Sequence, residues 1–226
     1  GFFNLSIRSR LIASNRLAHQ GGDGTLVVDG FDVIDDGVGF NDKNLASFKE
    51  AHTLSKVRLG GRGVGRFTFL KVFSSVRIRS VFKRESQALL REFDFSIEDE
   101  LKGADVTSEV AEKCGTQTSL RGMDEKFRAG WPTQPETIAE RVIAHFLIRF
   151  AARSCPPMTL ESPGHAPIDL HALFQSTVLA HIEEQFFDVS GHTFALQAYR
   201  HRDGRSRHEL NLCANGREVT TTKLRD

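Results

Sequence analysis

The chain has few cysteines, tyrosines and tryptophans, almost no net charge and no long hydrophobic run. Its three cysteines, Cys114, Cys155 and Cys213, lie far apart and form no CxxC pair, which argues against a disulfide framework and against a zinc site. One tryptophan and one tyrosine beside 18 phenylalanines favour core packing over base-stacking platforms. The chain contains 30 Lys and Arg residues and 29 Asp and Glu residues, which gives a formal charge of +1. Any basic site must therefore be local.

Membrane and export signals are also missing from the sequence. No apolar run approaches the roughly 20 residues of a membrane-spanning helix. The N-terminus lacks the basic start, apolar stretch and small-residue cleavage site of a signal peptide. We therefore expect a cytoplasmic protein with no membrane partner. With 226 residues, 39% of them hydrophobic, the chain is long enough for one large domain or for one and a half ordinary ones.

Alternating patterns predict several β-strands. In "TLVVDGFDVI", two β-branched runs flank Asp29-Gly30, a dipeptide that supplies positive φ in tight turns, so we interpret residues 25–34 as a β-hairpin. Downstream, Val76, Ile78 and Ser80 alternate with arginines, which predicts a half-buried strand. Further strands are predicted at residues 89–98, 115–123, 158–162 and 166–170, and within the tail from 194 to 224.

Helical spacing is clearest in residues 135–152. Apolar residues recur there three and four positions apart behind Pro135, which favours the first turn of a helix. We expect one long helix over this range. Shorter helices are predicted at residues 42–52, 66–73 and 171–184.

An acidic turn, "DVIDDGVGFND", follows the first β-branched segment. Asp35 and Asp36 precede Gly37 and Gly39, so the backbone can turn sharply and admit a flat ligand beside a carboxylate. Such a carboxylate can accept a hydrogen bond from an exocyclic amine. Taken alone, the pattern fits a tight turn without a ligand equally well.

A second turn, "GGRGVGRFTFL", is richer in glycine and precedes a predicted helix. Gly61, Gly63 and Gly65 would leave backbone N–H groups and the positive end of a helix dipole available to a phosphate. The stretch is not a Walker A loop, because no Gly-Lys-Ser/Thr follows, and no strand directly precedes it as a dinucleotide fingerprint requires. Charged side chains that could add to such a site are Lys56, Arg62 and Arg66.

Three motifs in this order resemble the nucleotide-binding boxes of the GHKL ATPases, the superfamily of gyrase B, Hsp90-type chaperones, histidine kinases and MutL. The motifs are "IDDGVGF", "GGRGVGRF" and "CGTQTSL". The resemblance implies an α+β fold, a two-layer α/β sandwich of the Bergerat type, with ATP between the helical layer and a mobile lid. The stretches "GFNDKNLASF" and "GGRGVGRFTFLKVF" look most similar to bacterial Hsp90-like ATP-binding proteins.

The resemblance also implies roles for individual residues. Asp35 would bind the adenine amino group, and Thr116 would support the adenine through its hydroxyl and a water. Gly37 and Gly39 would shape the adenine pocket, and the second glycine cluster would donate backbone N–H groups to the phosphates. The nucleotide-binding candidates are Asp35, Asp36, Gly37, Gly39, Lys56, Gly61, Arg62, Gly63, Val64, Gly65, Arg66 and Thr116.

The tail carries a second, weaker resemblance. "LCANGREVTTTKL", residues 212–224, is similar to the strand-turn-strand at the start of the transducer domain of MutL-type and gyrase-type proteins. A plain hairpin with an Asn-Gly turn explains it as well. On the first interpretation, residues 1–170 form a GHKL ATP-binding domain, and residues 175–226 begin a transducer-like domain that the chain does not complete.

One element of the family pattern is missing. GHKL ATPases carry a Glu-x-x-x-Asn helix, in which Glu activates the attacking water and Asn binds Mg²⁺. Residues 1–22 contain no Asp or Glu, and the position four before Asn15 is Leu11. Either the protein binds ATP without hydrolysing it, or the chain omits the helix. We favour omission, which would interrupt the backbone between about Ser14 and Gly24.

The sequence as a whole predicts an ATP-binding module that uses Mg²⁺, hydrolyses ATP slowly and couples lid closure to dimerisation and to an effector. The alternative is a non-hydrolysing ATP sensor. A histidine kinase is third, because it would not need residues 175–226. The basic stretch "YRHRDGRSRHEL" could touch nucleic acid, but a solvated turn explains it better. The catalytic residues and the metal ligands stay unassigned.

Overall fold

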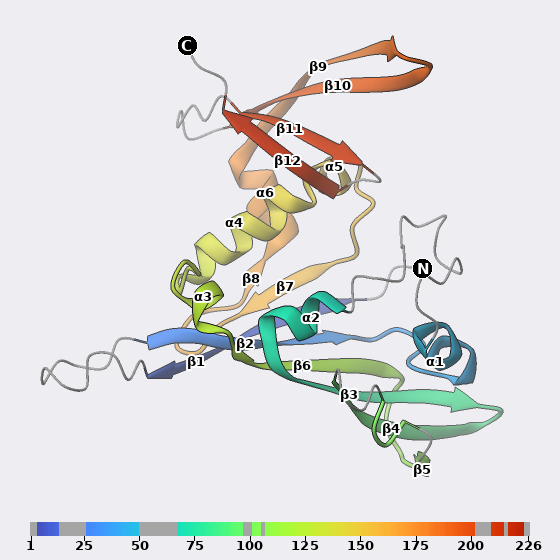
Figure 1. Ribbon diagram of the computed structural model, residues 1–226. Coiled ribbons are helices and arrows are strands. Elements are labelled where there is room, and N and C mark those ends of the chain that lie inside the picture. Colours follow the sequence, from blue (N-terminus) through green and yellow to red (C-terminus); the bar gives the residue numbers. More distant parts are fainter. Residues whose placement is uncertain are drawn as a thin grey trace, which may run out of the picture. The chain divides into compact units, whose positions relative to one another are not determined.

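The structure is a computed structural model that describes residues 4–13, 26–49, 67–96, 101–104, 107–201, 209–214 and 217–223 (Figure 1). The chain divides into two compact units. One comprises Gly1–Val142 and Pro156–Ile168, and the other comprises Ile143–Cys155 and Asp169–Asp226. No helix in the described ranges is long and apolar enough to cross a membrane.

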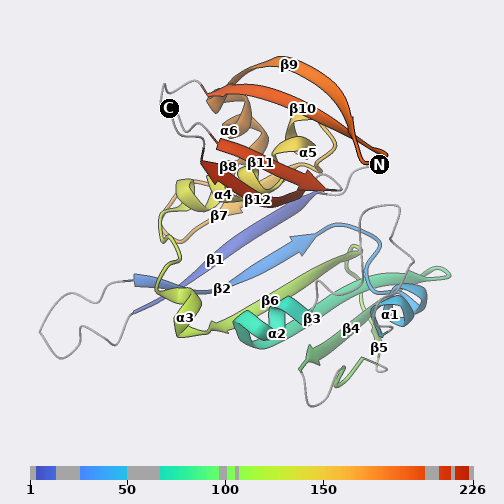
Figure 2. The ribbon, with the colours of Figure 1, turned by 45° about the horizontal axis from the view of Figure 1, so that its top comes forward.

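A mixed sheet of eight strands organises the first unit, in the order β5-β4-β3-β6-β2-β1-β7-β8 (Figure 2). Neighbouring strands from β5 to β1 are antiparallel, whereas β1 and β7 run parallel. The strands are β1 (Leu5–Ala13), β2 (Leu26–Asp35), β3 (Phe73–Arg84), β4 (Gln87–Phe95), β5 (Thr107–Glu109), β6 (Gly115–Met123), β7 (Met158–Glu161) and β8 (Ile168–Asp169).

Helices cover one face of this sheet. Leu45 of α1 packs in a buried cluster with Ile78 of β3 and Phe93 of β4, and Phe67 of α2 lies against Phe95 of β4. Because side chains alternate along a strand, this helix-covered face also carries Val76 and the other residues in phase with Ile78. The helices that precede or follow these strands are α1 (Asp42–Lys49), α2 (Phe67–Val72), α3 (Glu125–Arg128) and α4 (Pro135–His145). The expected fold class, α+β with a large central sheet and helices, is confirmed.

The predicted hairpin at residues 25–34 is wrong, because β2 runs without a turn from Leu26 to Asp35. Asp29-Gly30 lies inside the strand. A Cβ on Gly30 would collide with the backbone carbonyl of Leu120 in β6, so the glycine permits close strand contact. The Asp29 carboxylate accepts hydrogen bonds from the backbone of Gly122 and from the side chain of Arg128. A dipeptide typical of turns therefore serves strand packing here.

Two predicted helices also need correction. The helix expected at residues 135–152 is interrupted at Phe146, and α5 (Leu147–Ala151) follows as a separate helix. The helix expected at 171–184 ends early: α6 (Leu170–Thr177) passes directly into β9 (Val178–Val189). Thr177 donates its hydroxyl hydrogen to the carbonyl of Leu173 at the end of α6. Pairing with β10 then outweighs the helical spacing of the later residues. The short helix predicted at 66–73 is confirmed as α2.

The second unit contains two antiparallel hairpins besides α5 and α6. β9 pairs with β10 (His192–His201) through a turn at Ser190 and Gly191, both of which have positive φ. β11 (Glu209–Ala214) pairs with β12 (Arg217–Lys223), as the strand-turn-strand pattern predicts. Phe150 of α5 packs against His171 and Phe174 of α6. The likeness to a transducer domain remains a prediction.

The face of the sheet opposite the helices is polar, and Asp32 of β2 is its most buried charge. The Asp32 side chain is fully buried and accepts hydrogen bonds from Arg10, Arg121 and Ser119. Burial alone would raise the pKa of Asp32, but these hydrogen bonds more than offset it and lower the pKa from 3.8 to about 2. The ionised carboxylate therefore stabilises the folded state.

We expect this carboxylate to contribute about 2 kcal/mol to the free energy of unfolding at neutral pH, because its pKa is lower in the folded state. The contribution is complete above pH 3.8 and is lost as the pH falls towards 2. Denaturant titrations over this range should show a shallower loss of stability for Asp32→Asn than for the wild type. Glu140→Gln, which alters an exposed carboxylate of α4, is the control. Equal pH profiles for Asp32→Asn and the wild type would contradict the assignment.

Candidate functional site

Four polar side chains form a row across the helix-covered face, at the end of the sheet where β2 ends. Asp35 of β2 pairs with Thr116 of β6, Thr116 pairs with Ser80 of β3, and Ser80 pairs with Arg91 of β4. Residues paired across strands point to the same face, so the four side chains lie side by side. We call these residues the polar row. Two of the predicted motifs, the acidic turn and the "CGTQTSL" strand, thus meet in register.

The acidic turn is tied to this row by hydrogen bonds. Ser80 Oγ accepts a hydrogen bond from the backbone N–H of Phe40, with an N–O distance of 2.8 Å. Arg91 donates to the backbone carbonyl of Phe40 at 2.5 Å and to the Asp42 carboxylate at 2.8 Å. Within the turn, the Asp35 carboxylate accepts from the backbone N–H of Gly37 at 2.9 Å. The row therefore fixes the backbone that follows Asp35.

Glycine is required where this turn approaches the sheet. Gly39 has a φ of 72°, and a Cβ there would collide with the carbonyl of Val81 and would lie 2.9 Å from Ser80 Oγ. A Cβ on Gly115 would collide with the carbonyl of Asp35. A Cβ on Gly37 would lie 2.7 Å from the Asp35 carboxylate. The predicted glycines thus allow the turn and β6 to come close to Asp35.

The two adjacent aspartates have different surroundings. Asp36 is exposed, and its two carboxylate oxygens accept hydrogen bonds from the backbone and side-chain nitrogens of Asn4, at 2.5 and 2.7 Å. The hydrogen bonds from Asn4 lower the pKa of Asp36. Asp35 is half-buried and belongs to the polar row. The geometry therefore assigns Asp36 to the start of β1 and leaves Asp35 as the carboxylate beside Thr116.

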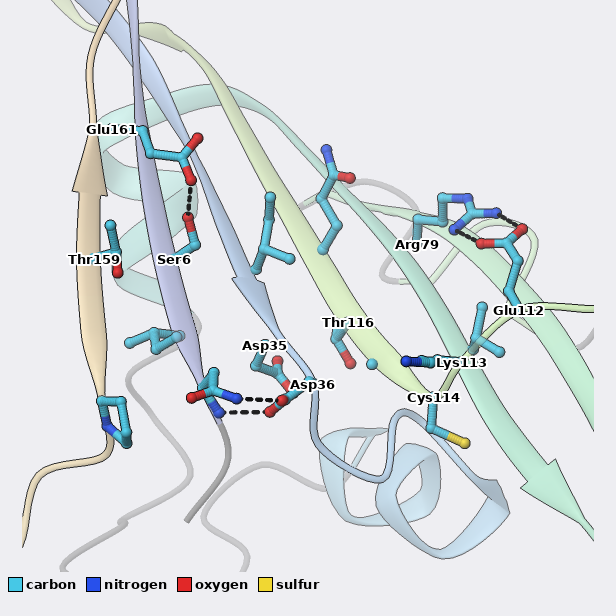
Figure 3. Close-up of a pocket in the computed structure, with 17 residues that line it drawn as sticks. Ser6, Asp35, Asp36, Arg79, Glu112, Lys113, Cys114, Thr116, Thr159 and Glu161 are labelled. Atoms are coloured by element: carbon cyan, nitrogen blue, oxygen red, sulfur yellow. Dashed lines mark hydrogen bonds and ion pairs between the residues drawn. The ribbon is translucent and has the colours of Figure 1, made fainter. Parts of the chain in front are cut away.

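A cavity of about 410 Å³ lies at this end of the sheet (Figure 3). Asp35, Asp36 and Thr116 line it, together with Ser6, Arg79 and Glu161 from the polar face. Two charged groups of the polar face have ion-pair partners: Arg79 binds Glu112 at 2.6 and 3.0 Å, and Glu161 binds Arg8 at 2.6 Å and accepts from Ser6 at 3.0 Å. The volume lies within the range of about 300–1,000 Å³ for small-molecule sites. The lining therefore combines residues of the polar face with Asp35 and Thr116 of the polar row.

The phosphate-binding half of the predicted site lies outside the described residues. This applies to Lys56, Gly61, Arg62, Gly63, Val64, Gly65 and Arg66, and also to Asn15 and the stretch from Ser14 to Gly24. Among the residues that the structure describes, no group of three or more His, Cys, Asp or Glu side chains could hold a metal ion. The structure therefore describes only the residues predicted for the nucleobase half of the site.

Ser80 and Arg91 were not predicted as site residues. The sequence did place Ser80 on the buried side of its strand, in phase with Val76 and Ile78. A serine among buried apolar positions needs hydrogen-bond partners, and this was the available signal. Arg91 carried a similar signal, since it shares its phase in the predicted strand with Leu89, Phe93 and Phe95.

Comparisons with solved structures give many distant matches, among them two ATPase domains. The ATPase domain of Aquifex aeolicus MutL complexed with ADP is 16% identical, covers 81% of this chain and gives a TM-score of 0.37. The 43K ATPase domain of Thermus thermophilus gyrase B in complex with an aminocoumarin is 14% identical, covers 82% of this chain and gives 0.39. The chain spans 64% and 48% of these proteins. No family model and no curated protein matches the sequence.

We expect Gly39→Ala to destabilise the protein more than Gly164→Ala. Both glycines have positive φ, which costs a residue with a Cβ about 1–2 kcal/mol. Only Gly39 also faces a carbonyl and a hydroxyl, whereas nothing lies within 4 Å of a Cβ on Gly164. Chemical denaturation of the two variants measures the difference directly. Equal losses would show that the approach of the turn to β3 can relax without cost.

Proposed function

We propose that the chain is a nucleotide-binding module of the GHKL type that binds ATP through the polar row and the acidic turn. The observation that carries the proposal is the register pair between Asp35 and Thr116 on the helix-covered face. The Asp35 carboxylate can accept a hydrogen bond from the exocyclic amine of adenine, and the neighbouring hydroxyl of Thr116 can hydrogen-bond to the adjoining ring edge. Gly37 and Gly39 let the turn approach closely enough for a flat base to lie beside it.

The phosphates would be held by the glycine cluster at residues 60–66, whose backbone N–H groups would act as donors just ahead of α2. Magnesium is part of the proposal because it accompanies ATP in this class, where it neutralises phosphate charge. In the complete protein, we propose that ATP closes a lid over the site, promotes association of two copies and is hydrolysed slowly, which controls an attached or partner effector.

A non-hydrolysing ATP sensor is the second candidate. It is favoured by one feature of the sequence, the lack of any Asp or Glu in residues 1–22 that could act as a general base. Both candidates share the same nucleobase site and the same closure on ATP. Phosphate release measured on the complete gene product separates them, because only the enzyme turns ATP over.

Asp35→Asn should lower the affinity for ATP by about tenfold to a hundredfold and leave the fold intact. The change removes one charge-assisted hydrogen bond to a buried amine, which is worth about 1.5–3 kcal/mol. Titration calorimetry measures the affinity, and circular dichroism checks the fold. Asp36→Asn is the matched control, because its carboxylate lies against Asn4, and it should have the smaller effect. Unchanged affinity in Asp35→Asn would remove this residue from the site.

Gly63→Val and Gly65→Val should weaken ATP binding more than Arg62→Ala. A Cβ in the glycine cluster would press on a phosphate or forbid the backbone angle that aims an N–H group at it, whereas a single exposed arginine contributes little. The same calorimetric titration ranks the three variants. If Arg62→Ala proved the most damaging, side-chain charge would hold the phosphate and the backbone assignment would be wrong.

A further inference from the structure

Ser80 is the most enclosed member of the polar row. Its side chain is completely buried, yet its hydroxyl contacts three polar groups: the backbone N–H of Phe40 at 2.8 Å, the carbonyl of Gly115 at 3.1 Å and the hydroxyl of Thr116 at 3.0 Å. The other residues in phase with it on β3, Val76 and Ile78, are apolar and buried. A buried hydroxyl costs free energy unless it is hydrogen-bonded, so these contacts are what make a serine tolerable here.

The hydroxyl of Ser80 has one hydrogen and two lone pairs. One lone pair is taken by the N–H of Phe40. The hydrogen can go to the Gly115 carbonyl or to Thr116 Oγ1, but not fully to both. If it goes to Gly115, Thr116 donates its own hydrogen to Ser80. If it goes to Thr116, the hydrogen of Thr116 is released to point elsewhere.

These two arrangements give Thr116 opposite properties towards a ligand. In the first, Thr116 offers a base or a water only lone pairs. In the second, Thr116 becomes a donor. Thr116 is largely buried, with 8% of its surface exposed, and it lines the cavity together with Asp35. Beside the amine that Asp35 would bind, the adenine ring edge carries a nitrogen acceptor, and this requires a donor, either directly or through a water.

We propose that Ser80 is a positioning residue of the nucleobase site, which sets the direction of the Thr116 hydroxyl hydrogen. The proposal rests on the proposed function, since it assumes that a purine is recognised beside Asp35. Ser80 touches no ligand and acts only through Thr116. Because one of its lone pairs accepts the N–H of Phe40, the same hydroxyl links the position of the acidic turn to the donor state of Thr116.

A double-mutant cycle on the full 226-residue chain tests this coupling. The variants are Ser80→Ala, Thr116→Val and the double variant, with ATP affinity measured by titration calorimetry and folding checked by thermal denaturation. Each single change should weaken ATP binding by up to about tenfold, and the double variant should lose no more than either single change. Thr118→Val is the control: it removes a hydroxyl from the same face of β6 that bonds to no described residue, and its affinity should match the wild type.

Losses that multiply in the double variant would overturn the proposal, because Ser80 would then act through the turn alone. Unchanged binding by Ser80→Ala would overturn it as well. If Ser80→Ala does not fold, Ser80→Cys keeps the volume with a weaker donor, and it should show the same coupling to Thr116→Val. If the wild type binds no ATP, the proposed function itself fails. If it binds ATP in an Asp35-dependent way but the cycle is additive, only the role of Ser80 fails.

Discussion

The close approach of β6 to β2 is the constraint on which the candidate site depends. Two glycines permit it: Gly30 in β2, opposite the carbonyl of Leu120, and Gly115 in β6, opposite the carbonyl of Asp35. A side chain at either place would force the strands apart. Because these strands pair in register, Asp35 comes to lie beside Thr116, and the next strand adds Ser80 to the same row. The backbone therefore sets the geometry that the side chains use.

The same sheet separates two kinds of interaction. On the helix-covered face, edge-to-face aromatic contacts join Phe48 of α1 to Phe93 and Phe95 of β4, which explains how a chain rich in phenylalanine builds its core. On the polar face, several charges form ion pairs, most closely at Asp32, which Arg10 and Arg121 enclose. The polar row departs from this division, because it places polar side chains on the helix-covered face.

Sequence patterns predicted the elements in which local and tertiary preferences agree. The alternation around Val76 and Ile78 gave the position of β3, and the short apolar spacing after the glycine cluster gave α2. Patterns failed where tertiary contacts prevailed. Asp29-Gly30 suggested a turn, but strand pairing on both sides kept β2 extended. Beyond Thr177, helical spacing gave way to an antiparallel partner that lies later in the chain. Local propensity cannot anticipate such a partner.

By itself, the sequence determined the local features from which nucleotide-binding residues were predicted, namely the glycines and aspartates of the acidic turn and the Gly-Thr start of a strand. Only the tertiary structure decided which of them work together. Asp35 lies beside Thr116 because β2 and β6 pair, whereas Asp36 accepts a hydrogen bond from Asn4, which precedes β1. Ser80 joins the site through a register that no single segment specifies. Strand register depends on contacts between distant segments, and those contacts exist only in the folded chain.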